Sequence, residues 1–371
     1  MTDPLGANRS LNYTTIFDVV RLVGADQPAG SGCAASTSNQ TFDANANVAS
    51  RDDFNGARVC FASDLSRNLE TTRVEGLSNA TNCSAVIPAA SVLPAGSRKV
   101  SSQWHPDWRL AVKVAEPKTL TTNVYNGQPD PFAGNTIASC APSGALLPDG
   151  KPIVVLCKKV EQATADGNGS QGLGAALDAS VPVRVWANTY NQYGQVLTAT
   201  DPLNHTTSYV YYADTSFTGV DPNAMGHTIG DLQTVTNAAG HVTSYTLYDK
   251  HGQVLQSTNP NGLTTTNTYD LRQRLLSTSV GGQTTAYVYD AVGQLTQVTL
   301  PDSAILSYSY DDAQRLTGVT DAAGNTITYT LDNAGNKTAE VVKDAGGALA
   351  RNISRVFDAL GRVQQVSGAA Q

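Results

Sequence analysis

The segment Tyr289-Asp290-Ala291-Val292-Gly293-Gln294-Leu295 decides the fold, because close copies of it recur through the second half of the chain. Each copy starts with a large hydrophobic residue, continues with Asp or Asn, and then passes through a turn. The first residues of five successive copies lie 20 or 21 residues apart, which is the signature of a repeat array. The copies begin at Tyr190, Tyr248, Tyr269, Tyr289, Tyr310, Leu331 and Phe357.

The Asp of each copy predicts a tight turn. Its carboxylate can accept a hydrogen bond from the main-chain N–H two residues on, and Gly in the fourth position adopts the positive φ that ends such a turn. A second turn of the same kind, such as Asn237-Ala238-Ala239-Gly240, lies about half a period away, so we expect a β-hairpin in every repeat. The expected structural anchors are Tyr190, Gly194, Tyr248, Asp249, Gly252, Tyr269, Asp270, Tyr289, Asp290, Gly293, Tyr310, Asp311, Asp332, Gly335, Phe357, Asp358 and Gly361.

The runs between the turns have the length and composition of strands. Leu263 to Tyr269 and Thr326 to Leu331, for example, are rich in Thr, Leu and Tyr. Tyr287 and Tyr289 are two residues apart and so share a face, where we expect their rings to stack with those of neighbouring hairpins. A lone hairpin is marginally stable in water, so the units should add edge to edge. The sequence therefore predicts an all-β fold, an extended twisted antiparallel sheet of stacked hairpins.

These Tyr-Asp-x-x-Gly-x-Leu/Val hairpins resemble the YD repeats of the Rhs family, which is related to toxin-complex components and teneurins. The resemblance covers about residues 183–371. It implies a spiral shell around a C-terminal toxin, and hence a non-catalytic wall segment that helps deliver the toxin in competition between bacteria. The expected partners are the remaining repeats and the toxin of the full-length protein, with secretion-system components or glycans as further candidates. The alternative is a cell-surface carbohydrate-binding or adhesion module built on exposed tyrosines.

The first half of the chain resembles diverged repeats. Phe42-Asp43-Ala44-Asn45-Ala46-Asn47-Val48 is a copy with Ala46 in place of Gly, and Thr2-Asp3-Pro4-Leu5-Gly6 reappears at 200–204, so we expect the chain to begin and end within repeats. The Gly- and Ala-rich segment from Ala163 to Asp178 is predicted to be an exposed loop. The predicted divisions are 1–97 (degenerate YD-like repeats), 98–182 (a divergent, loop-rich β region) and 183–371 (the repeat array, with an insertion at about 213–229).

Composition argues against several partners. Charged residues make up only 15% of the chain, against roughly 25% in an average domain. The net charge is −7, and the sequence contains no cluster of Lys and Arg residues. Nucleic acid and anionic membrane surfaces are therefore unlikely partners. No stretch approaches the roughly 18 apolar residues of a membrane span, and no targeting signal is visible. A secreted or cell-surface location is expected for the full-length parent protein, whereas this chain shows no targeting signal of its own.

The five cysteines, all in the first half, leave two interpretations open. They are spaced too widely for a CxxC metal site, and an odd number leaves at least one unpaired. A disulfide between Cys140 and Cys157 would close a short loop in an oxidising compartment, whereas buried free thiols are the alternative.

The most enzyme-like cluster is Trp104-His105-Pro106-Asp107-Trp108. A His and an Asp beside two indoles could be a general acid/base pair, but a Pro-containing bend usually makes a turn packed under aromatic rings. The turn is favoured, and no catalytic, cofactor-binding or metal-ligating residue is predicted. The other histidines, expected on the surface beside turns without metal-ligand spacing, are His205, His227, His241 and His251.

Overall fold

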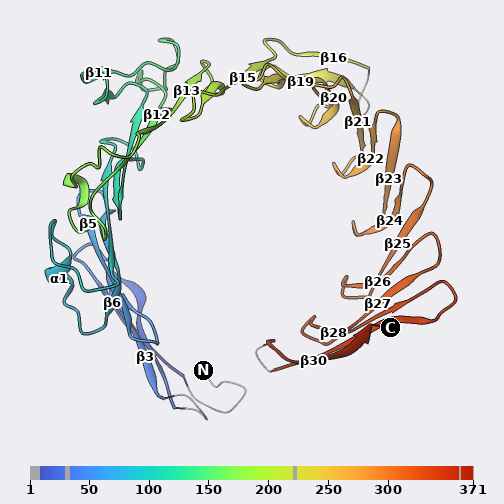
Figure 1. Ribbon diagram of the computed structural model, residues 1–371, viewed down its shortest axis with the longest axis horizontal. Coiled ribbons are helices and arrows are strands. Elements are labelled where there is room, and N and C mark those ends of the chain that lie inside the picture. The colour runs from blue at the N-terminus through green and yellow to red at the C-terminus, as the bar shows by residue number, and fades with distance from the viewer. Residues whose placement is uncertain (1–8, 30–33, 220–223, 359–360, 371) are drawn as a thin grey trace. The chain divides into compact units, whose positions relative to one another are not determined.

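The structure is a computed structural model that describes residues 9–29, 34–219, 224–358 and 361–370 (Figure 1). Twenty-eight of the described strands form one antiparallel sheet, and two more form a separate small ribbon. The prediction of an all-β antiparallel fold is confirmed. Contacts divide the chain into two compact units, Met1–Ser208 and Tyr209–Gln371, whereas the predicted division into three segments stays a prediction. The copy at 2–6 lies outside the described residues.

The first unit is a run of antiparallel strands in which each pairs with the next, except that β9 pairs with β12 across the small ribbon β10–β11. Its strands are β1 (Ser10–Ile16), β2 (Val19–Gln27), β3 (Ser36–Phe42), β4 (Val48–Asp52), β5 (Ala57–Asp64), β6 (Leu69–Ser78), β7 (Arg98–Trp104), β8 (Ala111–Glu116), β9 (Thr119–Tyr125), β10 (Pro129–Asp130), β11 (Thr136–Ile137), β12 (Leu156–Ala163), β13 (Arg184–Tyr190) and β14 (Val196–Thr200). The strand β15 (Thr206–Tyr211) lies at the boundary between the units.

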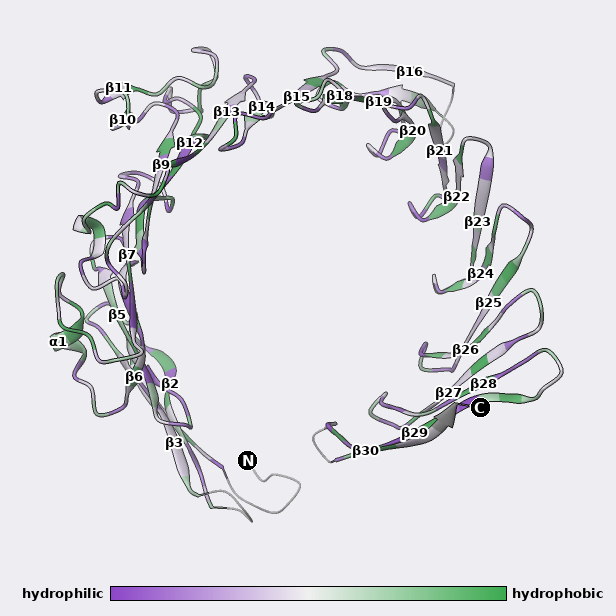
Figure 2. Cartoon of the chain, in the orientation of Figure 1, coloured by the Kyte–Doolittle hydropathy of each residue, from purple (hydrophilic) through white to green (hydrophobic). Residues whose placement is uncertain are grey.

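Long loops cover the sheet of the first unit and give it two small cores. One loop carries the helix α1 (Cys83–Val86), which has the hydrophobic colour in Figure 2 and places Val86 against Val74 of β6. A disulfide from Cys60 to Cys83 fastens this loop to β5. A second disulfide, Cys140–Cys157, fastens the loop between β11 and β12.

The disulfide considered from the sequence is therefore present, together with one that the sequence analysis did not propose. Cys33 lies outside the described residues.

The segment from Ala163 to Asp178 is packed against the protein, so its prediction as an exposed loop was wrong. It contains the 3-10 turn η1 (Gly172–Gly174), and Asp166 in it is only 3% exposed. The segment crosses β7, where the carbonyl of Asn168 accepts the N–H of Lys99 at 2.9 Å. The fully buried Lys99 ammonium donates to the carbonyl of Pro88 at 2.7 Å, and Asp166 interacts with its charge. Burial of this lysine requires both covering loops, which the sequence pattern does not show.

The second unit is largely a succession of hairpins, seen in Figure 1 as the yellow-to-red strands that follow one another along the chain. The insertion forms a ribbon of β16 and β17, of which residues 220–223 lie outside the description. The strands are β16 (Ser216–Thr218), β17 (Met225–His227), β18 (Leu232–Thr236), β19 (Val242–Tyr248), β20 (Val254–Thr258), β21 (Thr264–Tyr269), β22 (Leu275–Val280), β23 (Gln283–Tyr289), β24 (Leu295–Thr299), β25 (Ile305–Tyr310), β26 (Leu316–Thr320), β27 (Thr326–Leu331), β28 (Lys337–Lys343), β29 (Leu349–Phe357) and β30 (Val363–Ala370).

A β-bulge lies opposite each anchor of the array. In β23 and β24, Val288 pairs with Gln297 but Tyr289 pairs with Leu295, so Thr296 is an extra residue on the second strand. A bulge of this kind bends its strand and increases the local twist. The same shift occurs at Tyr190, Tyr248, Tyr269, Tyr310, Leu331 and Phe357.

The sheet of the second unit has two chemically different faces. Tyr287, Val298 and Leu306 are cross-strand neighbours on one face, whereas Gln297 and Ser307 face the other. Hydrophobic burial is therefore shared between adjacent strands on the first face, where Val298 is 8% exposed. No helix among the described residues is long and apolar enough to cross a membrane.

Candidate functional site

The row of turns that follows the anchors is the feature that every repeat shares, and the aspartates shape it. The carboxylate oxygen Oδ1 of Asp290 accepts the N–H groups of Val292, Gly293 and Gln294 at 2.8 to 3.0 Å. The Asp290 N–H donates to the carbonyl of Gln294 at 2.9 Å, which closes the loop. The same side-chain bond to the residue four positions on is made by Asn191, Asp249, Asp270, Asp311, Asp332 and Asp358.

The fourth residue of each turn has a left-handed backbone whether or not it is glycine. Gly293 has φ of +103°, a region that glycine enters without steric cost. Gln273 and Gln314 occupy the same position in their turns with φ of +65° and +64°, so these two turns carry backbone strain. The other glycines of this position, Gly194, Gly252, Gly335 and Gly361, all have positive φ.

The hydrogen bonds of the turn also stabilise the charged form of its aspartate. The guanidinium and the N–H of Arg315 hold the pKa of Asp311 below its ordinary value, and Asn336 does the same for Asp332. For Asp270 the largest cause of the lowered pKa is the main-chain N–H of Arg274. A carboxylate that accepts several N–H bonds is expected to resist protonation.

The anchor tyrosines join one hairpin to the preceding one. The hydroxyl of Tyr310 donates to the carbonyl of Leu295 at 2.8 Å, and that of Tyr289 donates to the carbonyl of Leu275 at 3.1 Å. The β24–β25 ladder runs only as far as the pair Gln297 and Ser307, so the phenol satisfies a carbonyl beyond the end of the ladder. Two further anchors make this bond, Tyr269 to Val254 at 3.4 Å and Tyr248 to Leu232 at 2.6 Å. We call this bond the anchor hydrogen bond.

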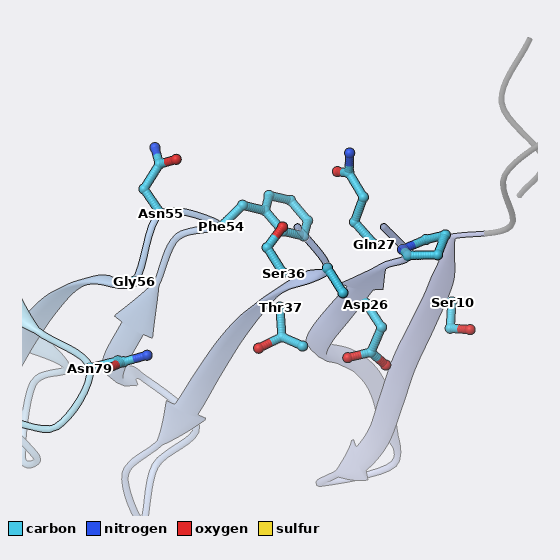
Figure 3. Close-up of a pocket in the computed structure, with 11 residues that line it drawn as sticks. Ser10, Asp26, Gln27, Ser36, Thr37, Phe54, Asn55, Gly56 and Asn79 are labelled. Atoms are coloured by element: carbon cyan, nitrogen blue, oxygen red, sulfur yellow. The ribbon is translucent and has the colours of Figure 1, made fainter. Parts of the chain in front are cut away.

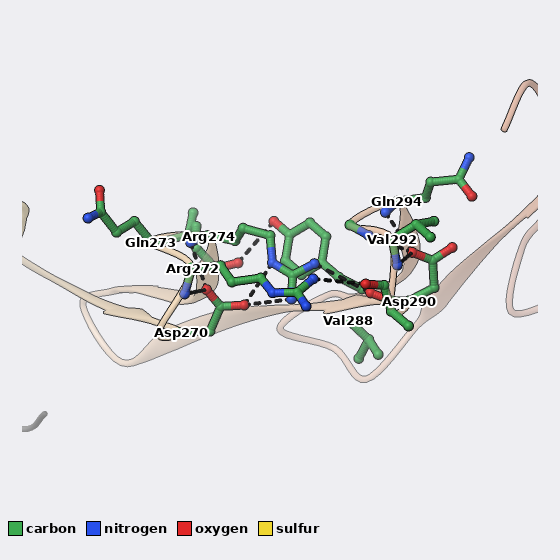
Figure 4. A network of polar contacts seen from close by, with 12 residues as sticks. Asp270, Arg272, Gln273, Arg274, Val288, Asp290, Val292 and Gln294 are labelled. Atoms are coloured by element: carbon green, nitrogen blue, oxygen red, sulfur yellow. Dashed lines mark hydrogen bonds and ion pairs between the residues drawn. The ribbon is translucent and has the colours of Figure 1, made fainter.

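A second side chain links successive turns, as Figure 4 shows for Arg274. Its guanidinium binds the Asp270 carboxylate at 2.7 Å, lies 4.6 Å from the centre of the Tyr289 ring and reaches the carbonyl of Asp290 at 3.4 Å. Arg315 makes the corresponding bond to the carbonyl of Asp332 at 2.7 Å. Glutamine replaces arginine in alternate repeats, where Gln253 donates to the carbonyl of Gln273 and Gln294 to that of Gln314.

The predicted stacking of tyrosine rings between hairpins was wrong for Tyr287, Tyr289, Tyr308 and Tyr310, all of which the structure describes. The ring contacts found among the described residues join His105 to Tyr125 and Tyr212 to His227. Strands that carry anchors alternate with strands that do not, so successive anchors are separated by about 9 to 10 Å, too far for rings to stack. The intervening strand contributes aliphatic residues instead, as Val298 does between β23 and β25.

The first unit contains the same anchor hydrogen bond, at the expected anchor Tyr190 and at two residues that the sequence did not single out as anchors, Tyr125 and Trp104. Tyr190 donates to the carbonyl of Leu156 at 2.8 Å and Tyr125 to that of Ala111 at 3.1 Å. Trp104 does so through its indole Nε1, 2.7 Å from the carbonyl of Glu70. The repeat spacing is altered at Trp104, because its partner across the bulge, Ala111, follows it by seven residues, whereas Leu295 follows Tyr289 by six. The turn at Asp43 likewise has the geometry of the array, with Ala46 at φ of +62°.

Comparison with known proteins identifies the repeat. Residues 248–284, 269–305, 289–326 and 310–348 each match the RHS Repeat family. Together these matches cover residues 248–348, which lie in the second unit. No match was found among curated proteins.

Three solved structures match most of the chain at low sequence identity. A crystal structure of TcdB2-TccC3 without its hypervariable C-terminal region has 13% identity and a TM-score of 0.46 over 94% of this chain and 19% of that one. A TcdB2-TccC3-Cdc42 structure has 13% identity and a TM-score of 0.44 over 95% and 22%. A Tc holotoxin pore from Photorhabdus luminescens has 11% identity and a TM-score of 0.39 over 94% and 21%. The chain thus spans about a fifth of the length of these structures.

The segment Trp104-His105-Pro106-Asp107-Trp108 forms a packed turn. His105 is 1% exposed, lies edge-on to the Tyr125 ring, and accepts the N–H groups of Asp107 and Trp108 through Nδ1 at 3.1 and 3.3 Å. Burial lowers the pKa of His105, so the ring is held neutral. Arg67 closes the turn through the carbonyls of His105 and Trp108. This is the bend under aromatic rings that the sequence favoured.

His227 departs from the expectation of a surface histidine. Its ring stacks on Tyr212 with centroids 3.7 Å apart, and its side chain is 17% exposed. The ribbon of β16 and β17 packs on Tyr212, so the His227 ring is partly shielded from solvent.

A cavity of about 580 Å³ near the first hairpins has a mostly polar lining (Figure 3). Asp26 in its wall accepts a hydrogen bond from Asn12, and the wall also contains Phe54 and Asn55. Nothing in this lining resembles a set of reacting groups. Across the described ranges, no cluster of three or more His, Cys, Asp or Glu side chains could hold a metal ion.

Proposed function

We propose that this chain is a non-catalytic wall segment of an RHS shell that encloses a C-terminal toxin and helps deliver it in competition between bacteria. The supporting observation is the double link between neighbouring hairpins. Tyr310 bonds to Leu295 and Arg315 bonds to Asp332, so each hairpin is tied to the one before it and the one after it. Side chains that a binding or catalytic surface would present are committed here to main-chain carbonyls.

The partners of such a wall are further RHS repeats and the cargo. The exposed hydrogen-bonding groups of a terminal strand are a template for another strand. Among the described strands, β1 pairs only with β2 and β30 only with β29. The remaining repeats of the parent protein would add here.

A secreted or surface-exposed parent protein agrees with the disulfides. Cys60–Cys83 and Cys140–Cys157 each fasten a covering loop of the first unit, and bonds of this kind persist in oxidising compartments. The alternative of a carbohydrate surface built on the array tyrosines is not favoured, because Tyr269, Tyr289 and Tyr310 use their hydroxyls to join strands.

Protease protection tests the proposal. The open reading frame that contains this chain would be expressed whole, with an epitope tag in the segment that follows the repeats, and treated with a broad-specificity protease. If the chain forms an enclosing wall, the tagged segment should survive while it is enclosed. It should be cleaved faster in the double variant Tyr310→Phe/Arg315→Ala than in the parent protein. Cleavage of the tagged segment at the rate of the same segment expressed alone would overturn the proposal.

A further inference from the structure

The turn between β7 and β8 is built around a ring nitrogen that carries no proton. Nδ1 of His105 accepts the N–H groups of Asp107 and Trp108 at 3.1 and 3.3 Å, so the single ring proton of the neutral imidazole lies on Nε2. The N–H of His105 donates to the carbonyl of Leu110 at 2.7 Å, which closes the turn. Nδ1 therefore acts here as Oδ1 of Asp290 does in the array, where it accepts the N–H groups of the residues that follow it.

The surroundings of this ring disfavour a positive charge on it. His105 is 1% exposed and meets the Tyr125 ring edge-on with centroids 5.9 Å apart, and its Nε2 has no hydrogen-bond partner among the described residues. Arg67 and Lys151 bring positive charge towards the ring, and the nearby negative group, Asp107, is itself paired with Lys151 at 3.4 Å. Burial is the largest cause that keeps the pKa of His105 below its ordinary value, and the two cations add to it against Asp107.

A proton on Nδ1 would be incompatible with the closed turn. Both nitrogens of a protonated imidazole are donors, so Nδ1 would then face the N–H groups of Asp107 and Trp108 with no acceptor between them. The added charge would also be buried, which costs free energy unless the charged group finds hydrogen-bond partners. The ring can therefore take up a proton only when the turn opens and brings His105 to water.

Opening of this turn would also disturb the strands that it joins. Trp104, the last residue of β7, donates its indole N–H to the carbonyl of Glu70 in β6 at 2.7 Å. Tyr125 of β9 donates to the carbonyl of Ala111, the first residue of β8, at 3.1 Å. Arg67, from the turn between β5 and β6, binds two carbonyls of the turn itself. Two anchor hydrogen bonds of the first unit therefore flank the histidine turn, and its opening should loosen the hairpin β7–β8.

We propose that the His105 turn is an acid-sensitive lock, which holds the hairpin β7–β8 closed at neutral pH and releases it in mildly acidic solution. The pKa of His105 is lower in the folded unit than its ordinary value of 6.5, so the folded ring binds fewer protons than the unfolded one. The stabilisation is therefore complete above about pH 7 and falls as the pH drops below the ordinary value. The lock goes beyond the wall role and does not depend on it, because it uses none of the links of the array.

Tryptophan fluorescence of the whole chain tests the lock selectively, because all three tryptophans, Trp104, Trp108 and Trp186, belong to the first unit. Urea denaturation would be followed in this way at about pH 8 and about pH 5.5. We expect the unfolding constant of the first unit to be about tenfold larger at the lower pH, since one proton is taken up on unfolding. His105→Asn should remove this difference, because Oδ1 of Asn lies where Nδ1 does and accepts the same N–H groups without titrating.

His205→Asn is the matched control, since His205 also belongs to the first unit but its side chain is 61% exposed and pairs with Asp201 at 3.1 Å. This variant should keep the pH dependence of the parent chain. The proposal fails if His105→Asn keeps that dependence too.

NMR of the parent chain with ¹⁵N-labelled histidine gives a second readout that needs no variant at His105. The ring should remain the tautomer with its proton on Nε2 between about pH 8 and pH 5.5 for as long as the first unit is folded. A His105 ring that titrates near its ordinary value of 6.5 in the folded unit, with no change in the urea midpoint, would overturn the proposal.

Discussion

The hydroxyl of Tyr310 donates a hydrogen bond of 2.8 Å to the main-chain carbonyl of Leu295, which begins the strand beside it. Leu295 lies beyond the end of the β24–β25 ladder, and the phenol of the next repeat satisfies its carbonyl. The first two residues of the motif therefore have different tasks. Aspartate shapes the turn within a hairpin, whereas tyrosine joins that hairpin to its predecessor.

The link made by arginine should be replaceable by glutamine. Arg315→Ala removes the bond to the Asp332 carbonyl and should lower the free energy of unfolding of the second unit by about 1 kcal/mol. Arg315→Gln should recover at least half of that loss, because Gln294 makes the same kind of bond in a neighbouring repeat. Urea denaturation of the two variants measures this. Equal destabilisation by both would show that the guanidinium charge matters and the link does not.

Relieving the strained turns should stabilise the array. Gln314 has φ of +64°, where a side chain costs about 1 kcal/mol or more, so Gln314→Gly should raise the free energy of unfolding by roughly 0.5 to 1 kcal/mol. Ala313→Gly in the same turn is the control and should be neutral or destabilising. Thermal melts would distinguish the two. A lower melting temperature for Gln314→Gly would contradict the assignment of strain.

The two disulfides should stabilise only the first unit. They close segments with sequence separations of 23 and 17, so replacing Cys60 and Cys83 together by Ser should cost that unit about 2 to 4 kcal/mol. The second unit contains no cysteine and should keep its stability. Hydrogen exchange measured on individual peptides, with and without dithiothreitol, reports the stability of each unit separately. Unchanged exchange in the segment 57–97 after reduction would be inconsistent with the fastening role.

Acid should weaken the turns of the array. The pKa of Asp332 is held below its ordinary value of 3.8 by the side chain and N–H of Asn336. A lowered folded-state pKa means that the stabilisation is complete above about pH 4 and is lost as the pH falls through the folded value. Asp332→Asn keeps an acceptor for the turn but cannot titrate, so its stability should depend less on pH between about 4 and 2. Stability would be followed by circular dichroism as a function of pH. The same pH dependence in Asp332→Asn and in the parent chain would contradict the assignment.

Local chemistry accounts for what the sequence predicted well. The turns follow from Asp and Gly at fixed spacing, and the strand at Thr326–Leu331 matches its expected bounds because the turns on either side fix them. The stacking of tyrosines was mispredicted because residue spacing along one strand does not reveal how many strands separate two anchors. The packed segment around Asp166 was missed because its burial depends on Lys99, a contact between residues far apart in the chain.

Hydrogen exchange in Tyr310→Phe tests the central claim most directly, that each hairpin is tied to the preceding one through its anchor. The variant keeps the ring and loses only the bond to Leu295, so exchange in β24 and β25 should accelerate about fivefold, equivalent to about 1 kcal/mol. Tyr287→Phe, at a hydroxyl with no hydrogen-bond partner among the described residues, should leave exchange in these strands as it is. Unchanged exchange in β24 and β25 of Tyr310→Phe, or the same acceleration in both variants, would contradict the account.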